Sequence, residues 1–299
     1  EYYYNPFGPC DSPKRFPEAD DIHISCNVTR LEIDNFRPIE TPRIYTTYNH
    51  NYLIYQGFLA TVGEWDWESA RYWSEAERYN VTSNRLSNTV LQELMNSSSP
   101  DTYNIFAGEG GDLEGLRPAI IDVYRRDTSE LKMIDFKLTN PMLFLLPDCP
   151  VGFLAGAEYR EEGLVDERDP RLTGTIEFVS YEGATYPEIS DVANSSPTGN
   201  NSGDRDVTSL FTEFAIPVLD NLDVQLALRY EDFSDVGSAT VGKVAFGWRP
   251  IEQLLFRGSW SEAFRAPNLI TVNEELVVRQ NTRVDAVCEY VEDETGANL

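Results

Sequence analysis

The chain has 299 residues, with 24 lysines and arginines against 50 aspartates and glutamates, which gives a formal net charge of −26. Binding to a phosphate backbone needs a basic surface, so this balance rules out nucleic acid as the default partner, and it argues against docking on an anionic lipid face. Hydrophobic residues make up 41% of the chain, which leaves material for a sizeable core or an apolar belt and argues against wholesale disorder.

The first residues carry neither a basic region nor an apolar run, so no signal peptide is predicted and the chain reads as a mature or internal segment. The opening segment is polar and rich in proline and contains Cys10 and Cys26. In an oxidising envelope we expect these two cysteines to form a disulfide that closes one loop. The longest apolar stretch, residues 142–146, ends at a proline, so no transmembrane helix is expected.

One helix is predicted between Asn84 and Asn96, inside residues 74–116, which form the first long polar stretch of the chain. Leucine and valine recur at helical spacing at Leu86, Val90, Leu91 and Leu94. We interpret this helix as local packing beneath a loop.

The strongest signal in the chain is period-2 alternation, which is typical of strands with one apolar and one polar face. It is clearest in the run Leu222, Val224, Leu226, Leu228, with polar or small residues between. The same pattern recurs in residues 151–160, 210–216, 222–230, 242–248 and 254–261.

The connections between these strands are unequal in length. Short turns are predicted at residues 62–64, 146–150, 216–221 and 249–253, and long polar stretches at 74–116, 160–206 and 264–299. Short turns at one end and long loops at the other are typical of a transmembrane β-barrel, and tryptophans near the strand ends agree with aromatic girdles. A soluble β-sandwich or lectin-like binding module explains the alternation equally well, and only the loop asymmetry favours the barrel.

Three blocks near the end of the chain carry a family resemblance: residues 229–237 (RYEDFSDVG), 247–250 (GWRP) and 256–269 (FRGSWSEAFRAPNL). In this order they resemble the barrel of the TonB-dependent receptors of Gram-negative outer membranes. Weaker matches in the right order lie upstream, at 4–8 (YNPFG), 63–68 (GEWDWE), 146–152 (LPDCPVG) and 156–162 (GAEYREE). Cys149 stands where the family usually has glycine.

The resemblance implies an all-β transmembrane antiparallel barrel, of which residues 1–299 supply about eight strands out of about 22. The segments 74–116, 160–206 and 264–299 are then long extracellular loops. Nothing in the chain resembles the amino-terminal plug domain, its short TonB-engaging box or a closing strand, so we expect a fragment.

The family resemblance also implies a function: an outer-membrane receptor that binds a scarce, large nutrient and imports it into the periplasm with energy transmitted by TonB. The implied partners are the TonB energy-coupling complex, reached through the plug, the nutrient, and the outer membrane with its lipopolysaccharide. No cofactor, metal site or catalytic residue is predicted. With only two histidines and 50 acids, close carboxylate pairs arise by chance, although a secreted carboxylate hydrolase is the third alternative.

The polar face of the predicted strands should line the barrel interior, where it would meet the plug or a transiting ligand. The alternative is simple solvation of a water-filled interior, with cross-strand charge pairs. The candidates are Glu158, Arg160, Glu213, Arg229, Lys243 and Arg257.

We expect a carbohydrate rather than an iron chelate as the nutrient. Siderophores are mostly anionic and would be repelled by the carboxylates that crowd the long stretches. Aromatic faces stack on sugar rings, and carboxylates accept hydrogen bonds from sugar hydroxyls.

Overall fold

The structure is a computed structural model that describes residues 2–12, 14–17, 25–26, 40–108, 111–146, 149–181 and 183–274. Of the third predicted loop, 264–299, the part after residue 274 lies outside the described residues. No helix in the described ranges is long and apolar enough to cross a membrane.

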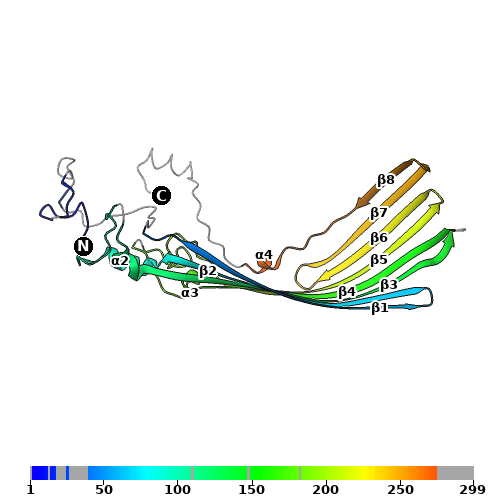
Figure 1. The fold of residues 1–299 in the computed structure, drawn as a ribbon, viewed down its shortest axis with the longest axis horizontal. Coiled ribbons are helices and arrows are strands. Elements are labelled where there is room, and N and C mark those ends of the chain that lie inside the picture. The colour runs from blue at the N-terminus through cyan, green and yellow to red at the C-terminus, as the bar shows by residue number, and fades with distance from the viewer. Residues whose placement is uncertain are drawn as a thin grey trace.

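The chain forms one sheet of eight antiparallel strands, which lie side by side in sequence order. Figure 1 shows this sheet as an elongated, curved trough with β1 and β8 at its two edges. The predicted all-β class and partial barrel of about eight strands are therefore confirmed. The strands are β1 (Ile44–Val62), β2 (Trp65–Leu86), β3 (Ile120–Leu146), β4 (Cys149–Arg168), β5 (Asn201–Leu219), β6 (Leu222–Phe233), β7 (Gly237–Ile251) and β8 (Leu254–Ser261).

At one end of the sheet, the short-turn end, the connections that the structure describes are all tight. Two residues join β1 to β2, and the β5–β6 and β7–β8 connections are equally short. Gly63 in the first of these turns has φ +66°, a left-handed conformation that glycine adopts without a steric penalty. These turns are where the sequence predicts them.

The opposite end, the long-loop end, carries the helices. The β2–β3 connection contains α1 (Asn88–Met95), α2 (Leu113–Leu116) and the short helix η2 (Arg117–Ala119), and the β4–β5 connection contains α3 (Pro170–Thr173). The β6–β7 connection is short, and α4 (Leu269–Asn273) follows β8. The predicted helix is present as α1, although Leu86, the first residue of the predicted helical spacing, ends β2 instead. A small core beneath α1 contains Leu86, Leu91, Tyr103, Leu116 and Ala119.

The strands run farther toward the long-loop end than the alternation indicates. Residues 74–86 continue β2, 160–168 continue β4 and 201–206 begin β5, so the boundaries expected at 74–116 and 160–206 are too wide. In these parts both faces are polar and the period-2 signal is lost, although the ladder continues. Cross-strand ion pairs stand on both faces, such as Arg78–Asp127 and Arg126–Glu77, with N–O distances of 2.8 and 2.7 Å.

Candidate functional site

The pairing register of the eight strands shows on which of the two faces of the sheet each side chain lies. Directly opposed residues share a face, so Phe153, Phe214, Leu226, Val244 and Trp260 form one row across five strands. This side is the apolar face. The residues that alternate with them, such as Asp223 and Arg229 on β6, form the charged face.

The apolar face is exposed and aromatic toward the short-turn end. On β6 it carries no charge from Leu222 to Tyr230, a span of nine residues (222–230), and the first charge is Asp232. Trp248 and Phe256 stack with ring centroids 5.8 Å apart, and both side chains are more than two-fifths exposed. An exposed apolar patch that crosses this many strands marks a surface that meets an apolar environment.

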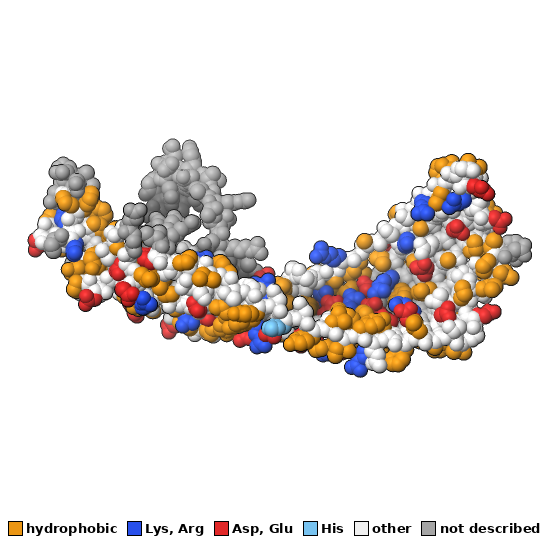
Figure 2. All heavy atoms as spheres, in the orientation of Figure 1, with side chains coloured by type: hydrophobic (Ala, Val, Ile, Leu, Met, Phe, Trp, Pro, Cys, Tyr) orange, Lys and Arg blue, Asp and Glu red, His pale blue; other side chains and the backbone are white. Residues whose placement is uncertain are grey.

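The charged face holds all six side chains predicted to line the interior, because the register places them on the same side of the sheet. Figure 2 shows basic and acidic side chains gathered in the hollow of the trough. The six are Glu158 and Arg160 on β4, Glu213 on β5, Arg229 on β6, Lys243 on β7 and Arg257 on β8.

Glu158, Arg160 and Arg229 meet in one ion-pair network. Arg160 contacts Glu158 at 2.9 Å, and Arg229 contacts the same carboxylate at 3.3 Å. Glu231 joins both arginines, at 3.5 Å from Arg160 and 2.9 Å from Arg229. Ser209, fully buried between them, donates a hydrogen bond to Glu231 and accepts one from Arg229. The network therefore fixes three neighbouring strands to one another through side chains.

A second arginine site lies nearer the long-loop end. Arg205 is 4% exposed and donates two hydrogen bonds to Asp235, at 2.8 and 2.6 Å. It also donates to the carbonyl of Pro267 at 2.8 Å, and so joins the β6–β7 turn to the segment that follows β8. The hydrogen bond from Arg205 holds the pKa of the Asp235 carboxyl below its usual value.

The remaining predicted residues lie toward the short-turn end. Gln225 connects Glu213 with Lys243: it donates to the carboxylate and accepts from the lysine Nζ. Arg257 is exposed and forms no ion pair with any residue the structure describes. The six candidates thus form three groups: three of them share the ion-pair network, Glu213 and Lys243 are linked through Gln225, and Arg257 stands apart.

Sequence reasoning missed Glu231, Ser209 and Arg205. Glu231 and Ser209 continue the same alternation toward the long-loop end, so extending the period-2 rule by one step would have placed them on the charged face. Arg205 pairs with a residue in a turn, and no sequence pattern indicates that contact.

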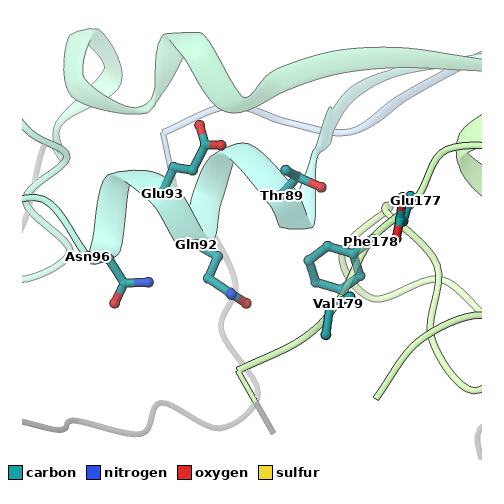
Figure 3. A pocket seen from close by; sticks show the side chains of 7 residues that line it. All are labelled: Thr89, Gln92, Glu93, Asn96, Glu177, Phe178 and Val179. Atoms are coloured by element: carbon teal, nitrogen blue, oxygen red, sulfur yellow. The ribbon is translucent and has the colours of Figure 1, made fainter. Parts of the chain in front are cut away.

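A pocket of about 400 Å³ lies at the long-loop end, between α1 and the β4–β5 connection. Figure 3 shows the aromatic ring of Phe178 turned toward α1, whereas the side chain of Glu93 points away from this ring. The lining residues are Thr89, Gln92 and Glu93 from the helix and Asn96 at its C-cap, with Glu177, Phe178 and Val179 from the connection. Sequence analysis did not predict this pocket, because its two walls lie about 80 residues apart in the chain and share no motif.

Asp191 ties the helical wall of the pocket to the β4–β5 connection. Its carboxylate, on a residue 4% exposed, accepts hydrogen bonds from the backbone N–H and the hydroxyl of Thr89, both at 2.7 Å, and from the Ser87 hydroxyl at 3.1 Å. Asn88 adds a hydrogen bond from its side-chain amide to the Ser190 carbonyl at 2.8 Å. The first turn of α1 is therefore tied to the other connection.

The amino-terminal segment docks on the same loops. Tyr2 donates a hydrogen bond from its hydroxyl to the carbonyl of Tyr103 at 2.7 Å. Burial of the Tyr103 side chain raises the pKa of its hydroxyl, and the hydrogen bond to Glu40 raises it further. The two cysteines predicted to pair are joined in the structure, with Cα atoms 4.9 Å apart, within the range of about 4.4–6.8 Å for a disulfide.

Comparison with known proteins identifies the family. Residues 19–281 match the family model described as "TonB dependent receptor-like, beta-barrel". No curated protein sequence matches the chain.

Similar solved structures include two mutants of the ferric enterobactin receptor PfeA of Pseudomonas aeruginosa. One is 17% identical, with 70% of this chain and 26% of that chain covered and a TM-score of 0.39. The other is 20% identical, with 77% and 27% covered and a TM-score of 0.41. The chain thus spans about a quarter of the length of these receptors.

Proposed function

Because the chain belongs to the β-barrel family of TonB-dependent receptors, we propose that it forms part of the wall of an outer-membrane receptor that imports a large nutrient into the periplasm. The observation that carries the proposal is the two-faced sheet. It exposes an aromatic, uncharged band on one side and a charged network on the other. Import is driven by the TonB energy-coupling complex acting through a plug domain.

The apolar face is the lipid-facing side of this wall. A transmembrane β-strand needs about 9–11 residues, and the uncharged span on β6 has nine, 222–230. Toward the long-loop end the uncharged band stops and the same face becomes acidic, with Glu161 on β4 directly opposite Asp206 on β5. These carboxylates stand at the level of the lipopolysaccharide anions and the divalent cations that bridge them.

The charged face lines the interior. Charged groups there stay hydrated in a wide lumen, so their ion pairs cost less desolvation than in a dry core. Glu158, Arg160, Glu213, Arg229, Lys243 and Arg257 are the lumen residues that meet the plug or a transiting ligand. The chain performs no covalent chemistry in this account.

The long-loop end faces outward and binds the nutrient. We propose a neutral carbohydrate, because the chain carries 50 acids against 24 basic residues and an anionic iron chelate would be repelled. The polar pocket with one aromatic wall beside α1 supports the same ligand class.

Uptake measurements in intact cells test this proposal. Strains with and without the gene, and with and without TonB, would be supplied with labelled neutral oligosaccharides or with labelled ferric siderophores. We expect oligosaccharide uptake to be lost when either gene is absent, and siderophore uptake to be unchanged by loss of the receptor gene. Selective loss of siderophore uptake would refute the ligand class. A receptor that purifies as a soluble monomer without detergent would favour the lectin-like alternative and refute the membrane wall.

A further inference from the structure

We propose that the pocket between α1 and residues 177–179 is a subsite for one neutral sugar unit of the imported ligand. This inference rests on the proposed carbohydrate import and assigns it a location. The pocket volume, about 400 Å³, lies at the lower end of the range of about 300–1,000 Å³ for ligand sites. It therefore suits a small part of a longer ligand.

Most polar side chains of the pocket have no hydrogen-bond partner in the part of the protein that the structure describes. Within the described residues, the side chains of Gln92, Glu93, Asn96 and Glu177 make no hydrogen bond or ion pair with another residue, whereas Thr89 is engaged by Asp191. Two amides supply both donors and acceptors, and two carboxylates supply acceptors. A sugar hydroxyl both donates and accepts, so a polyhydroxylated ring uses both kinds of group.

The apolar wall has the complementary character. Phe178 is 8% exposed and its ring points toward α1 (Figure 3), while Val179 beside it is 51% exposed. Ligand sites typically combine such apolar walls with a few convergent polar groups. The C–H face of a pyranose can lie against this wall while its hydroxyls meet the helix.

The charges of the pocket select against other ligand classes. Glu93 and Glu177 stand in the lining and no lysine or arginine does, so an anionic group is repelled. A cation would satisfy the carboxylates but would gain nothing from the amide N–H donors of Gln92 and Asn96. A neutral polyol satisfies both sets of groups.

The helical wall is held in place before any ligand arrives. Asp191 anchors the first turn of α1 through Ser87 and Thr89, and Leu91 on the opposite side of the helix is buried in the small core. Binding therefore costs little backbone entropy on this wall, because only the side chains remain to be ordered. The polar side chains that face the pocket are presented from a fixed helix.

Calorimetry on the full-length receptor in detergent tests the subsite, with neutral di- to hexasaccharides of glucose, galactose, mannose and xylose as probes. The double variant Gln92→Ala/Asn96→Ala should raise the Kd roughly 5-fold to 150-fold, since each of the two lost hydrogen bonds contributes about 0.5–1.5 kcal/mol. Alanine favours helix more than either residue, so α1 is retained. Ser98→Ala, an exposed position in the same connection outside the pocket, is the matched control and should leave the Kd unchanged.

A second variant tests the charge argument. Glu93→Gln/Glu177→Gln should keep the Kd for neutral sugars within about threefold, because amides still donate and accept. It should also allow hexuronate oligosaccharides to bind, which the unmodified receptor rejects.

Three results would overturn the subsite: no neutral sugar binds, the helix double variant binds as tightly as Ser98→Ala, or glucosamine oligomers bind more tightly than neutral ones. Uptake in the same strains separates this inference from the proposed function. TonB-dependent sugar uptake that is unchanged in the helix double variant refutes the subsite alone. Sugar binding that depends on Gln92 and Asn96 without TonB-dependent uptake refutes the transport function alone.

Discussion

Removal of the Asp191 carboxylate should release α1 from the β4–β5 connection. In the Asp191→Ala variant the backbone N–H of Thr89 loses its acceptor at 2.7 Å, and two hydroxyl donors lose theirs. A buried donor left unsatisfied costs about 1–3 kcal/mol. Loss of a negative charge at a helix N-terminus adds about 0.3–1 kcal/mol.

The sum is about 1.3–4 kcal/mol for local opening of α1, and the partial cap that the Ser87 side chain still provides to Val90 keeps it from rising further. At about 1.4 kcal/mol per tenfold change, this predicts an opening equilibrium that rises by roughly 8-fold to 700-fold. Asp191→Asn keeps one acceptor but loses the charge, so it should cost about half as much.

Hydrogen exchange of the amides in residues 88–95 measures this opening directly. We expect loss of protection confined to α1 and to residues 189–193, with the strand amides unchanged. Asp101→Asn, an exposed aspartate in the same connection, is the matched control and should exchange at the original rate. If Asp191→Ala exchanged like this control, the assignment of Asp191 as the anchor would be wrong.

Two further predictions concern other contacts at the long-loop end. Because Arg205 lowers the folded-state pKa of Asp235 below its ordinary value of 3.8, their pairing should protect the β6–β7 turn above pH about 4 and weaken as the pH falls through that lower pKa. Hydrogen exchange of the turn amides, corrected for intrinsic rates, should show this loss of protection as a step in the pH profile. Asp235→Asn should open the turn more often and abolish the step. A step that survives in this variant would contradict the assignment. Proteolysis without reductant should release one linked peptide that contains Cys10 and Cys26 and separates on reduction, whereas two independent peptides would contradict the pairing.

The sequence predicts the sheet best where it crosses the apolar band. In residues 222–230 one face is uniformly apolar, so the alternation indicates the strand, its two faces and the direction of Arg229. The same rule places Lys243 and Arg257 correctly on the charged face, because the ladder transfers each face from strand to strand.

The prediction fails where the sheet leaves that band. Glu77 and Arg126 pair on one face while Arg78 and Asp127 pair on the other, so both sides are polar and the period-2 signal vanishes. The sequence therefore indicates a loop for residues 74–86, although backbone hydrogen bonds keep them in β2. The hydropathy pattern shows which face of a strand is apolar, and here the strands continue beyond the point where the apolar face ends.

The loop pocket could not be predicted for a different reason. Phe178 and Gln92 belong to separate connections, and those connections are joined by hydrogen bonds from the backbone and hydroxyl groups at the start of α1 to Asp191. Such long-range contacts between irregular segments leave no periodicity. The helix itself was predictable, since Leu91 and Leu94 repeat at helical spacing, but the surface it faces was not.

The central claim is that the two faces of the sheet meet lipid on one side and water on the other. Adjacent positions of β6 test it: Leu226→Arg places a charge on the apolar face, and Ala227→Arg places the same charge on the charged face. Unfolding of the receptor in lipid vesicles should show a loss of about 2–4 kcal/mol for Leu226→Arg and under about 1 kcal/mol for Ala227→Arg. Equal losses, or a larger loss for Ala227→Arg, would contradict the account.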